Sequence, residues 1–302
     1  MRKEFSQAIE RVALADERVV FISGDLGFNA LENVQQALGP RFLNAGVAEQ
    51  NMVGLAAGMA YRGYLVFCYS IAPFVVYRCL EQFRNDVCLH NMPVFLVGNG
   101  GGYGYGIMGS THHAIEDLAA LSPLQNVTCY VPGFADEVAY CVDRIVQEGR
   151  PAYLRLGVGT ALPEDTMLSG SFRVVTQTEN SLGTIVALGP SVTNVLNALN
   201  QEGLAGKYNV LTALTLPLQL TDEVARLIQN GGPLLVVEEH VSIGGLAQQL
   251  SVKLLERSIA PSGFRSLTAQ GYPDGRYGDQ AYHQKQSGLD AEHIAHVLQQ
   301  LV

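Results

Sequence analysis

The sequence predicts an α/β protein built from two doubly wound α/β domains with mostly parallel sheets. Short segments rich in β-branched and aromatic residues alternate with segments of helical periodicity along most of the chain. The composition agrees with this fold class, because 48% of the residues are hydrophobic, only 16% are charged and 32 are glycine. Parallel strands buried on both faces have such a composition, and 302 residues suffice for two full cores.

The predicted strands of the first half are short, and most are bounded by Gly, Pro or Asn. We expect strands at residues 19–23, 42–44, 64–69, 93–97, 127–131 and 152–156. Helical patterns lie between them, at residues 4–15, 49–61, 74–90, 114–121 and 135–148. Ligands of parallel sheets bind beyond the carboxyl ends of the strands, so the segments that follow these strands hold the candidate site.

The second half repeats the alternation after a composition shift between Gly157 and Ser171, where residues 158–165 are typical of a linker. Strands are expected at residues 183–188, 209–213, 234–237 and 265–269, and helices at 191–202, 221–230, 245–256 and 290–300. Residues 271–286, rich in Gly, Tyr and Asp, predict an irregular loop at the surface or an interface. We therefore place one domain at residues 1–160 and a second at 172–302.

Charge and cysteine content exclude several classes of protein. The net charge of −9, with no more than two adjacent Lys or Arg residues, argues against a nucleic-acid surface. The N-terminal residues lack the pattern of a signal peptide, and no apolar stretch reaches the roughly 18 residues of a membrane span. The five cysteines lack metal-ligand spacing and predict reduced core thiols in a cytoplasmic protein; they are Cys68, Cys79, Cys88, Cys129 and Cys141.

The most informative segment is residues 46–52, Gly-Val-Ala-Glu-Gln-Asn-Met. Glu49 stands at the head of an otherwise uncharged helical pattern, residues 51–60. A carboxylate at the start of a buried helix is costly unless it has a partner or takes up a proton. A favourable interaction with the helix dipole is the simpler alternative.

Two further segments carry a resemblance to a known family. Residues 104–112 read Gly-Tyr-Gly-Ile-Met-Gly-Ser-Thr-His, and residues 237–245 read Val-Glu-Glu-His-Val-Ser-Ile-Gly-Gly. Together with the segment around Glu49, they resemble the transketolase family over most of the chain, from about Arg2 to Val302. The resemblance implies the last two domains of a full-length transketolase, the pyrimidine-binding domain and the C-terminal domain.

The resemblance implies thiamine diphosphate as the cofactor, with Glu49 bonding a ring nitrogen of its pyrimidine. His112 matches a family histidine that contacts substrate, where it would stabilise charge developing on the substrate oxygen. Phe74 and Tyr69 are the candidates for the aromatic wall of the pyrimidine site, although both also suit a core position. Asp25 matches a family acid near the cofactor, and a turn-stabilising role is its alternative.

Several substrate positions depart from the family pattern. Met108 replaces an Asp that reads the donor sugar, Asn29 stands where the family has Ser, and His113 replaces a Gln. The Arg usual soon after Leu156, a phosphate ligand, is missing. An uncharged side chain makes no charge-assisted bond to a phosphate. We therefore expect an acceptor that is an atypical or carrier-linked sugar, with these residues beside it.

The chain also lacks the Gly-Asp-Gly motif that binds metal and diphosphate in this family. The resemblance therefore implies a separate subunit that carries the diphosphate-binding domain and ligates Mg²⁺ or Ca²⁺, in an α2β2 assembly. Gly244 and Gly245 are expected to permit close packing where the C-terminal domain meets its neighbour.

We expect the pyrimidine-binding (β) subunit of a split thiamine diphosphate-dependent transketolase, which transfers a two-carbon ketol unit to an aldehyde or ketone. One alternative is a 2-oxoacid dehydrogenase E1 β subunit, whose glycine loop usually continues into Gln-His-Ser. Another is a non-catalytic regulatory partner, against which the presence of both Glu49 and His112 argues.

Overall fold

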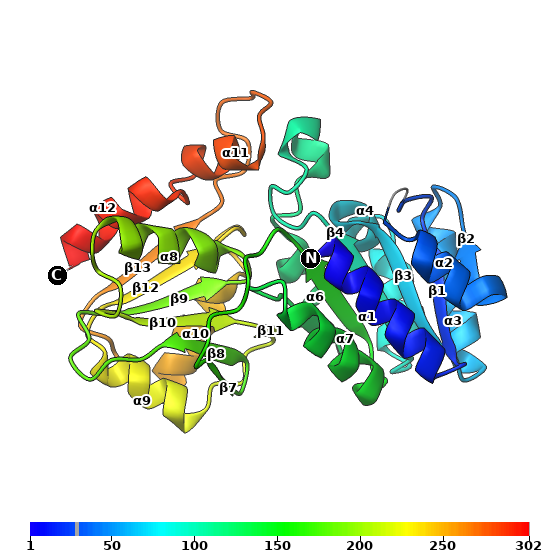
Figure 1. The fold of residues 1–302 in the computed structure, drawn as a ribbon, viewed down its shortest axis with the longest axis horizontal. Coiled ribbons are helices and arrows are strands. Elements are labelled where there is room, and N and C mark those ends of the chain that lie inside the picture. Colours follow the sequence, from blue (N-terminus) through cyan, green and yellow to red (C-terminus); the bar gives the residue numbers. More distant parts are fainter. Residues whose placement is uncertain (28–29, 302) are drawn as a thin grey trace.

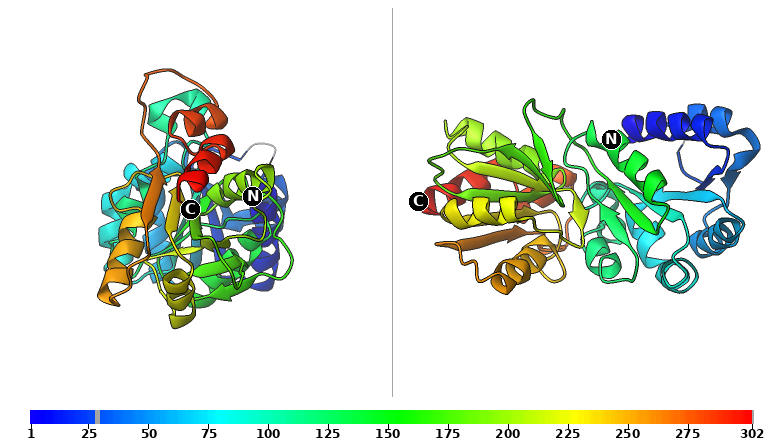
Figure 2. Two further views of the ribbon diagram at one scale, coloured as in Figure 1. Left: turned by 90° about the vertical axis from the view of Figure 1, so that its left-hand side faces the viewer. Right: turned by 90° about the horizontal axis from the view of Figure 1, so that it is seen from below.

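The computed structural model describes residues 1–27 and 30–301, which form two α/β units lying side by side (Figure 1). The first unit, coloured blue to green, carries the N-terminus, and the second, green to red, carries the C-terminus. Both contain a mostly parallel sheet with helices on its two faces (Figure 2). The predicted fold class is therefore confirmed.

The first sheet has seven strands within the described residues. Their order is β11 (Thr215–Leu216), β5 (Thr128–Tyr130), β6 (Ala152–Leu156), β4 (Val94–Asn99), β3 (Leu65–Ile71), β1 (Val19–Ser23) and β2 (Phe42–Asn44). All pairs from β5 to β2 are parallel. The strand β11 comes from the second half of the sequence and pairs antiparallel with β5. The parallel strands end at one edge, where the predicted site segments follow.

Helices cover both faces of this sheet because their apolar residues recur at helical spacing. The core on one face includes residues of α1 (Arg2–Ala15), α2 (Glu32–Leu38) and α7 (Glu137–Glu148). The other face is covered by α3 (Glu49–Tyr61), α4 (Ala72–Tyr77) and α6 (Asp117–Leu121). The single helix predicted at residues 74–90 is instead divided. Cys79 leaves helical geometry at φ −118°, and α5 (Leu80–Gln82) and the π-helical η2 (Phe83–Cys88) follow.

The second sheet has six strands in the described part of the chain. Their order is β13 (Phe264–Thr268), β12 (Leu234–Glu238), β9 (Thr184–Leu188), β10 (Asn209–Ala213), β8 (Phe172–Thr176) and β7 (Met167–Ser169). One face packs against α8 (Ser191–Gln201) and α12 (Ala291–Leu301), and the other against α9 (Asp222–Asn230) and α10 (Leu246–Glu256).

Two sequence predictions for the second half need correction. The strands β7 and β8, which follow the predicted linker at residues 158–165, and the two-residue strand β11 are absent from the predicted strands. The helix α11 (Gln280–Gln286) occupies the end of the predicted irregular loop. It begins there because the side chain of Asp279 accepts a hydrogen bond from the Tyr282 N–H at 2.8 Å, which caps the helix.

A shared core joins the two units. One cluster of buried apolar residues includes Leu121 of the first unit and Leu246 of the second. Gly244 has φ +75°, and a Cβ added there would lie 2.5 Å from the Cβ of Ala119. Only glycine therefore allows the segment before α10 to approach α6 so closely. The expected packing role of Gly244 is confirmed.

None of the helices in the described residues is long and apolar enough to cross a membrane. All five cysteines are free thiols and buried, as predicted.

Candidate active site

Glu49 lies at the first position of α3, just beyond the end of β2, and only 1% of its surface is exposed. The hydroxyl of Ser70, at the end of β3, donates a hydrogen bond to Glu49 Oε1 at 2.9 Å. The guanidinium of Arg78 donates to Glu49 Oε2 at 2.7 Å. Both oxygens of this buried carboxylate therefore have partners, which compensates for the loss of water.

Arg78 connects Glu49 to two other predicted site residues. Its Cζ lies over the ring of Phe74, 4.5 Å from the centroid, as in a cation–π contact. The imidazole of His112 meets the same ring edge-on, with centroids 5.0 Å apart. The side chain of Arg78 is 40% exposed, and Phe74 and His112 are half-buried. The structure thus forms a row, Glu49–Arg78–Phe74–His112, which runs from the interior to the surface.

The sequence interpretation missed Arg78, although a signal was present. Arg78 is the one basic residue between positions 63 and 83, and it follows Phe74 by four residues in a predicted helix. Residues at i and i+4 lie on the same helix face. A lone cation at that spacing from a candidate site aromatic is therefore a signal for the site.

The residues around Glu49 fit the pyrimidine of a thiamine cofactor. Such a ring needs a carboxyl group at a ring nitrogen and an apolar wall, which Glu49 and Phe74 can supply. Gly24 brings backbone close to the carboxylate, because a Cβ added there would lie 3.3 Å from Ser70 Oγ and 3.6 Å from Glu49 Oε1. A larger residue at that position would crowd the carboxylate.

Asp25 lies in the turn that follows β1 and is exposed, with φ +60°. Its Oδ1 accepts a hydrogen bond from Asn44 Nδ2 at 2.9 Å, and Asn44 Oδ1 accepts from the Gly46 N–H at 2.9 Å. Asp25 also lines a surface hollow of about 250 Å³ with Phe42. It therefore ties together the two loops that precede Glu49, as expected of a turn-stabilising Asp, and stays at the margin of the site.

Tyr69 is a correction to the sequence interpretation. It is 2% exposed, and its ring stacks on Phe5 of α1 with centroids 5.8 Å apart. Successive side chains of a strand point to opposite faces. Because Ser70 faces Glu49, Tyr69 faces the other side of the sheet. The ring of Tyr69 belongs to the core, and Phe74 is the predicted aromatic residue that contacts Arg78, the ion-pair partner of Glu49.

The remaining predicted substrate residues lie on or beside the glycine-rich loop. Met108, 51% exposed, ends the short helix η3 (Gly106–Met108), and His112 ends η4 (Ser110–His112). His113 is a second correction, because it is only 4% exposed and packs against Tyr103 rather than toward Phe74. Burial lowers the pKa of His113. Asn29 lies outside the described residues.

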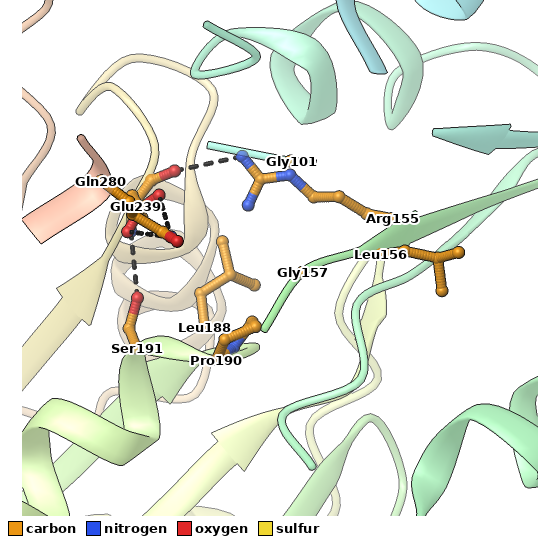
Figure 3. Close-up of a pocket in the computed structure, with 9 residues that line it drawn as sticks. All are labelled: Gly101, Arg155, Leu156, Gly157, Leu188, Pro190, Ser191, Glu239 and Gln280. Atoms are coloured by element: carbon orange, nitrogen blue, oxygen red, sulfur yellow. Dashed lines mark hydrogen bonds between the residues drawn. The ribbon is translucent and has the colours of Figure 1, made fainter. Parts of the chain in front are cut away.

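Arg155 of β6 is hydrogen-bonded to Glu239 of the second unit, beside Gly101 of the glycine loop (Figure 3). Arg155 Nη2 donates to the Glu239 carbonyl at 3.1 Å, and Gln280 Nε2 donates to Glu239 Oε1 at 2.9 Å. A Cβ on Gly101 would lie 2.5 Å from Arg155 Cγ. The cavity among these residues has a volume of about 20 Å³. That is room for one water molecule, so the junction is structural.

His240, in the segment that resembles the family, also joins the units. Its Nε2 accepts from the Ala119 N–H at 3.2 Å, so its Nδ1–H donates to the Val241 carbonyl at 2.7 Å. Both ring nitrogens are therefore used within the protein, which supports a structural role.

Comparison with known proteins identifies the family. Residues 1–160 match the family model described as the transketolase pyrimidine binding domain. The chain belongs to the transketolase family. Transketolases use thiamine diphosphate, and the row that begins at Glu49 lies within the matched residues.

Curated transketolase relatives match over most of the chain. A protein of Actinobacillus succinogenes, named as one of the subunits of an apulose-4-phosphate transketolase, is 31% identical over 84% of this chain and 82% of its own. A protein of the same name from Phocaeicola vulgatus is 29% identical over 85% of this chain and 84% of its own length. A 1-deoxy-D-xylulose-5-phosphate synthase of Geobacter sulfurreducens is 31% identical over 96% of this chain and 47% of its own.

A solved structure described as a split gene transketolase, an inactive β4 tetramer, has a TM-score of 0.80. It is 26% identical over 99% of this chain and 97% of its own. Together the matches identify this chain as the β-type subunit of a split transketolase-like transferase, which implies a partner subunit. The predicted family and enzyme class are confirmed, and they favour a transketolase over a 2-oxoacid dehydrogenase subunit.

Proposed function

We propose that this subunit binds the pyrimidine half of thiamine diphosphate through Glu49 and Phe74 and transfers a two-carbon ketol unit to an aldehyde or ketone. The observation that carries the proposal is the buried Glu49 carboxylate, 1% exposed, whose row of contacts reaches Phe74 and His112. A structural acid at a helix N-terminus needs no such connection to a half-buried aromatic ring and a histidine.

Each residue of the row has a distinct task. When bound, thiamine diphosphate supplies the carbon nucleophile that accepts and releases the ketol unit. Glu49 shares a proton with the pyrimidine nitrogen, and the Ser70 hydroxyl fixes its Oε1. The ring of Phe74 forms an apolar wall that excludes water. His112, at the surface end of the row, donates a hydrogen bond to the substrate oxygen on which negative charge develops.

The partner subunit completes the site in this proposal. It carries the diphosphate-binding domain and ligates Mg²⁺ or Ca²⁺, and the two kinds of subunit form an α2β2 assembly with two equivalent sites. The described residues contain no cluster of three His, Cys, Asp or Glu side chains that could hold a metal ion. We take residues 1–160 and 172–302 as the two domains of this subunit, and its five buried free thiols suit a cytoplasmic location.

We propose an atypical sugar as the substrate. Met108 is exposed at the end of η3, the short helix that precedes the one ending at His112, so an apolar side chain stands where the family has an acid that reads the donor. Apulose 4-phosphate, the sugar in the names of two relatives, is the first donor to test. Efficient transfer from xylulose 5-phosphate to ribose 5-phosphate would contradict the proposed preference.

The test of the proposed function is cofactor-dependent stabilisation of the assembled enzyme. Thiamine diphosphate with Mg²⁺ should raise the melting temperature of the complex with the partner subunit, because a ligand that binds only the folded state stabilises it. The same additions should leave the isolated subunit unchanged. A complex that neither gains stability nor turns over any ketose with the cofactor would refute the proposal.

A further inference from the structure

The segment Tyr103–His113, called here the substrate loop, is bound at its start by the second unit. The main-chain N–H of Tyr103 donates to Glu239 Oε1 at 2.5 Å. The Tyr103 hydroxyl donates to the Gly271 carbonyl at 3.1 Å, and it lies 3.0 Å from the hydroxyl of Ser287. Three contacts from one residue thus fix where the loop begins.

His283 of α11 touches the start, the middle and the end of this loop. Its ring stacks on Tyr103, with centroids 5.2 Å apart and planes inclined by 24°. A Cβ on Gly106 would lie 2.7 Å from His283 Cδ2, so the imidazole packs directly against the main chain of Gly106. The ring of His113 meets it edge-on at 4.6 Å. In Figure 1, α11 rises beside the short helices of the loop.

The same cluster holds buried polar atoms that lack partners. His113 Nε2, His283 Nε2 and Tyr272 Oη are buried, and none has a hydrogen-bond partner among the described residues. Their rings lie 4.6 to 6.1 Å apart, and His283 is only 2% exposed. Buried polar atoms are rarely unpaired, and ordered water commonly joins such groups. These three atoms, on rings packed against one another, are the groups that a shared buried water would join.

We propose that His283 is a positioning residue, which sets the substrate loop, and with it His112, through stacking and through a buried water shared with His113 and Tyr272. His112 directly precedes His113 in the chain, and its ring packs against Phe74. A shift of the loop end therefore moves His112 relative to the proposed cofactor wall. The inference rests on the proposed role of His112 and gives the second domain a part in substrate binding.

The test compares variants of His283 in the complex with the partner subunit. His283→Phe keeps a ring on Gly106 but removes the nitrogen, whereas His283→Gln keeps a polar atom. We expect the phenylalanine variant to raise the KM for the ketose donor and lower kcat/KM at least tenfold, since small displacements of catalytic groups are costly. The glutamine variant should recover part of this loss. His296→Phe, at an exposed position of α12, is the matched control and should resemble the parent.

Cofactor binding separates this inference from the proposed function. All variants should keep the near-ultraviolet circular dichroism change produced by thiamine diphosphate and Mg²⁺, because Glu49 and Phe74 are untouched. Tyr272→Phe removes only a hydroxyl and should show a smaller KM effect of the same sign, even if a His283 variant fails to fold. The inference would be overturned if Tyr272→Phe and His283→Phe both kept the kcat and KM of the parent enzyme. It would also be overturned if His283→Phe and His283→Gln lost the same share of kcat/KM. A parent complex without cofactor-dependent turnover would instead overturn the proposed function.

Discussion

Glu49 and Arg78 form an ion pair of unequal burial, in which Arg78 Nη1 lies 2.7 Å from Glu49 Oε2. The side chain of Glu49 is 1% exposed and that of Arg78 is 40% exposed. The cation therefore reaches in from the surface and compensates for a charge that water cannot reach.

Removal of this cation should destabilise the fold. We expect Arg78→Met to lower the free energy of unfolding by about 1–3 kcal/mol, because Glu49 keeps only the Ser70 hydroxyl. Arg78→Lys should retain part of the stability. Urea denaturation measures both. Arg84→Met is the control, because Arg84 is exposed and its guanidinium donates to the side chain of the adjacent Asn85. Equal midpoints for the Arg78→Met and Arg84→Met proteins would show that the pair contributes little.

Glu49→Gln should separate cofactor binding from turnover. The amide keeps the size of the side chain but cannot share a proton, so kcat should fall by about 100-fold or more. Binding of thiamine diphosphate to the complex, measured by calorimetry, should weaken much less. Glu256→Gln changes an exposed acid on α10 and should leave both quantities unaltered. An active Glu49→Gln enzyme would refute the role assigned to Glu49.

The close contact at Gly244 predicts that adding one methyl group there lowers the free energy of unfolding substantially. Gly244→Ala places a Cβ 2.5 Å from Ala119 at φ +75°. Gly203→Ala has a similar φ of +63° with nothing within 4 Å, so it isolates the backbone cost of about 1–2 kcal/mol. The Gly244 variant should lose roughly a further 1–3 kcal/mol through crowding. Thermal unfolding of the two variants measures the difference in their stability. Equal stability of the Gly244→Ala and Gly203→Ala proteins would show that the close contact between the units contributes little.

His240 should make stability depend on pH. Burial lowers the pKa of His240, and the positive charge of Arg155 adds to this effect while Asp117 opposes it. The folded protein therefore keeps His240 neutral where the unfolded chain already binds a proton. Its contribution to stability is complete above about pH 6.5 and is lost as the pH falls, by at most about 1.4 kcal/mol per pH unit.

Urea midpoints measured between about pH 5 and pH 8 test this dependence. The urea midpoint of the His240→Asn protein should fall less steeply below about pH 6.5 than the midpoint of the parent protein. His296→Asn, exposed on α12, should follow the parent curve. A parallel decline in all three proteins would assign the effect to other groups, such as His113, whose pKa burial also lowers.

Arg155 and Asp117 form a fully buried pair, with Arg155 Nε 2.8 Å from Asp117 Oδ2 and exposures of 4% and 0%. Arg155→Met leaves a buried carboxylate without its cation and should cost about 3–5 kcal/mol. Arg11→Met breaks a half-exposed pair with Asp143 and should cost less than about 1 kcal/mol. Chemical denaturation of both variants checks the contrast, and similar costs would contradict it.

The strand and helix alternation was predictable because parallel strands leave continuous apolar runs in the sequence. The range predicted for the helix that begins at Glu49, residues 49–61, agrees with the observed Glu49–Tyr61. Among the missed elements, β8 (Phe172–Thr176) is a mostly apolar strand whose first four residues are buried, and the others are short or polar. The strand β7 has three residues, and α11 is polar except for Ala281 and Tyr282 and depends on the Asp279 cap. Periodicity carries no signal for such elements.

The site was only partly predictable for a similar reason. The position of Glu49 after a strand places it at the sheet edge, and a motif match supports its role. The burial of Tyr69 depends on which face of β3 it occupies, and a shift of one residue exchanges the faces. His283 lies 170 positions after His113 in the sequence, so only the folded structure brings the two rings together.

The strand β11 has a consequence for any attempt to divide this chain. Residues Thr215 and Leu216 pair with Cys129 and Tyr130, so they cover the outer side of β5. A fragment truncated near residue 160 would leave those main-chain amides open to recruit a strand from another molecule. Such a fragment should aggregate, even though its own sequence contains every residue proposed to touch the pyrimidine.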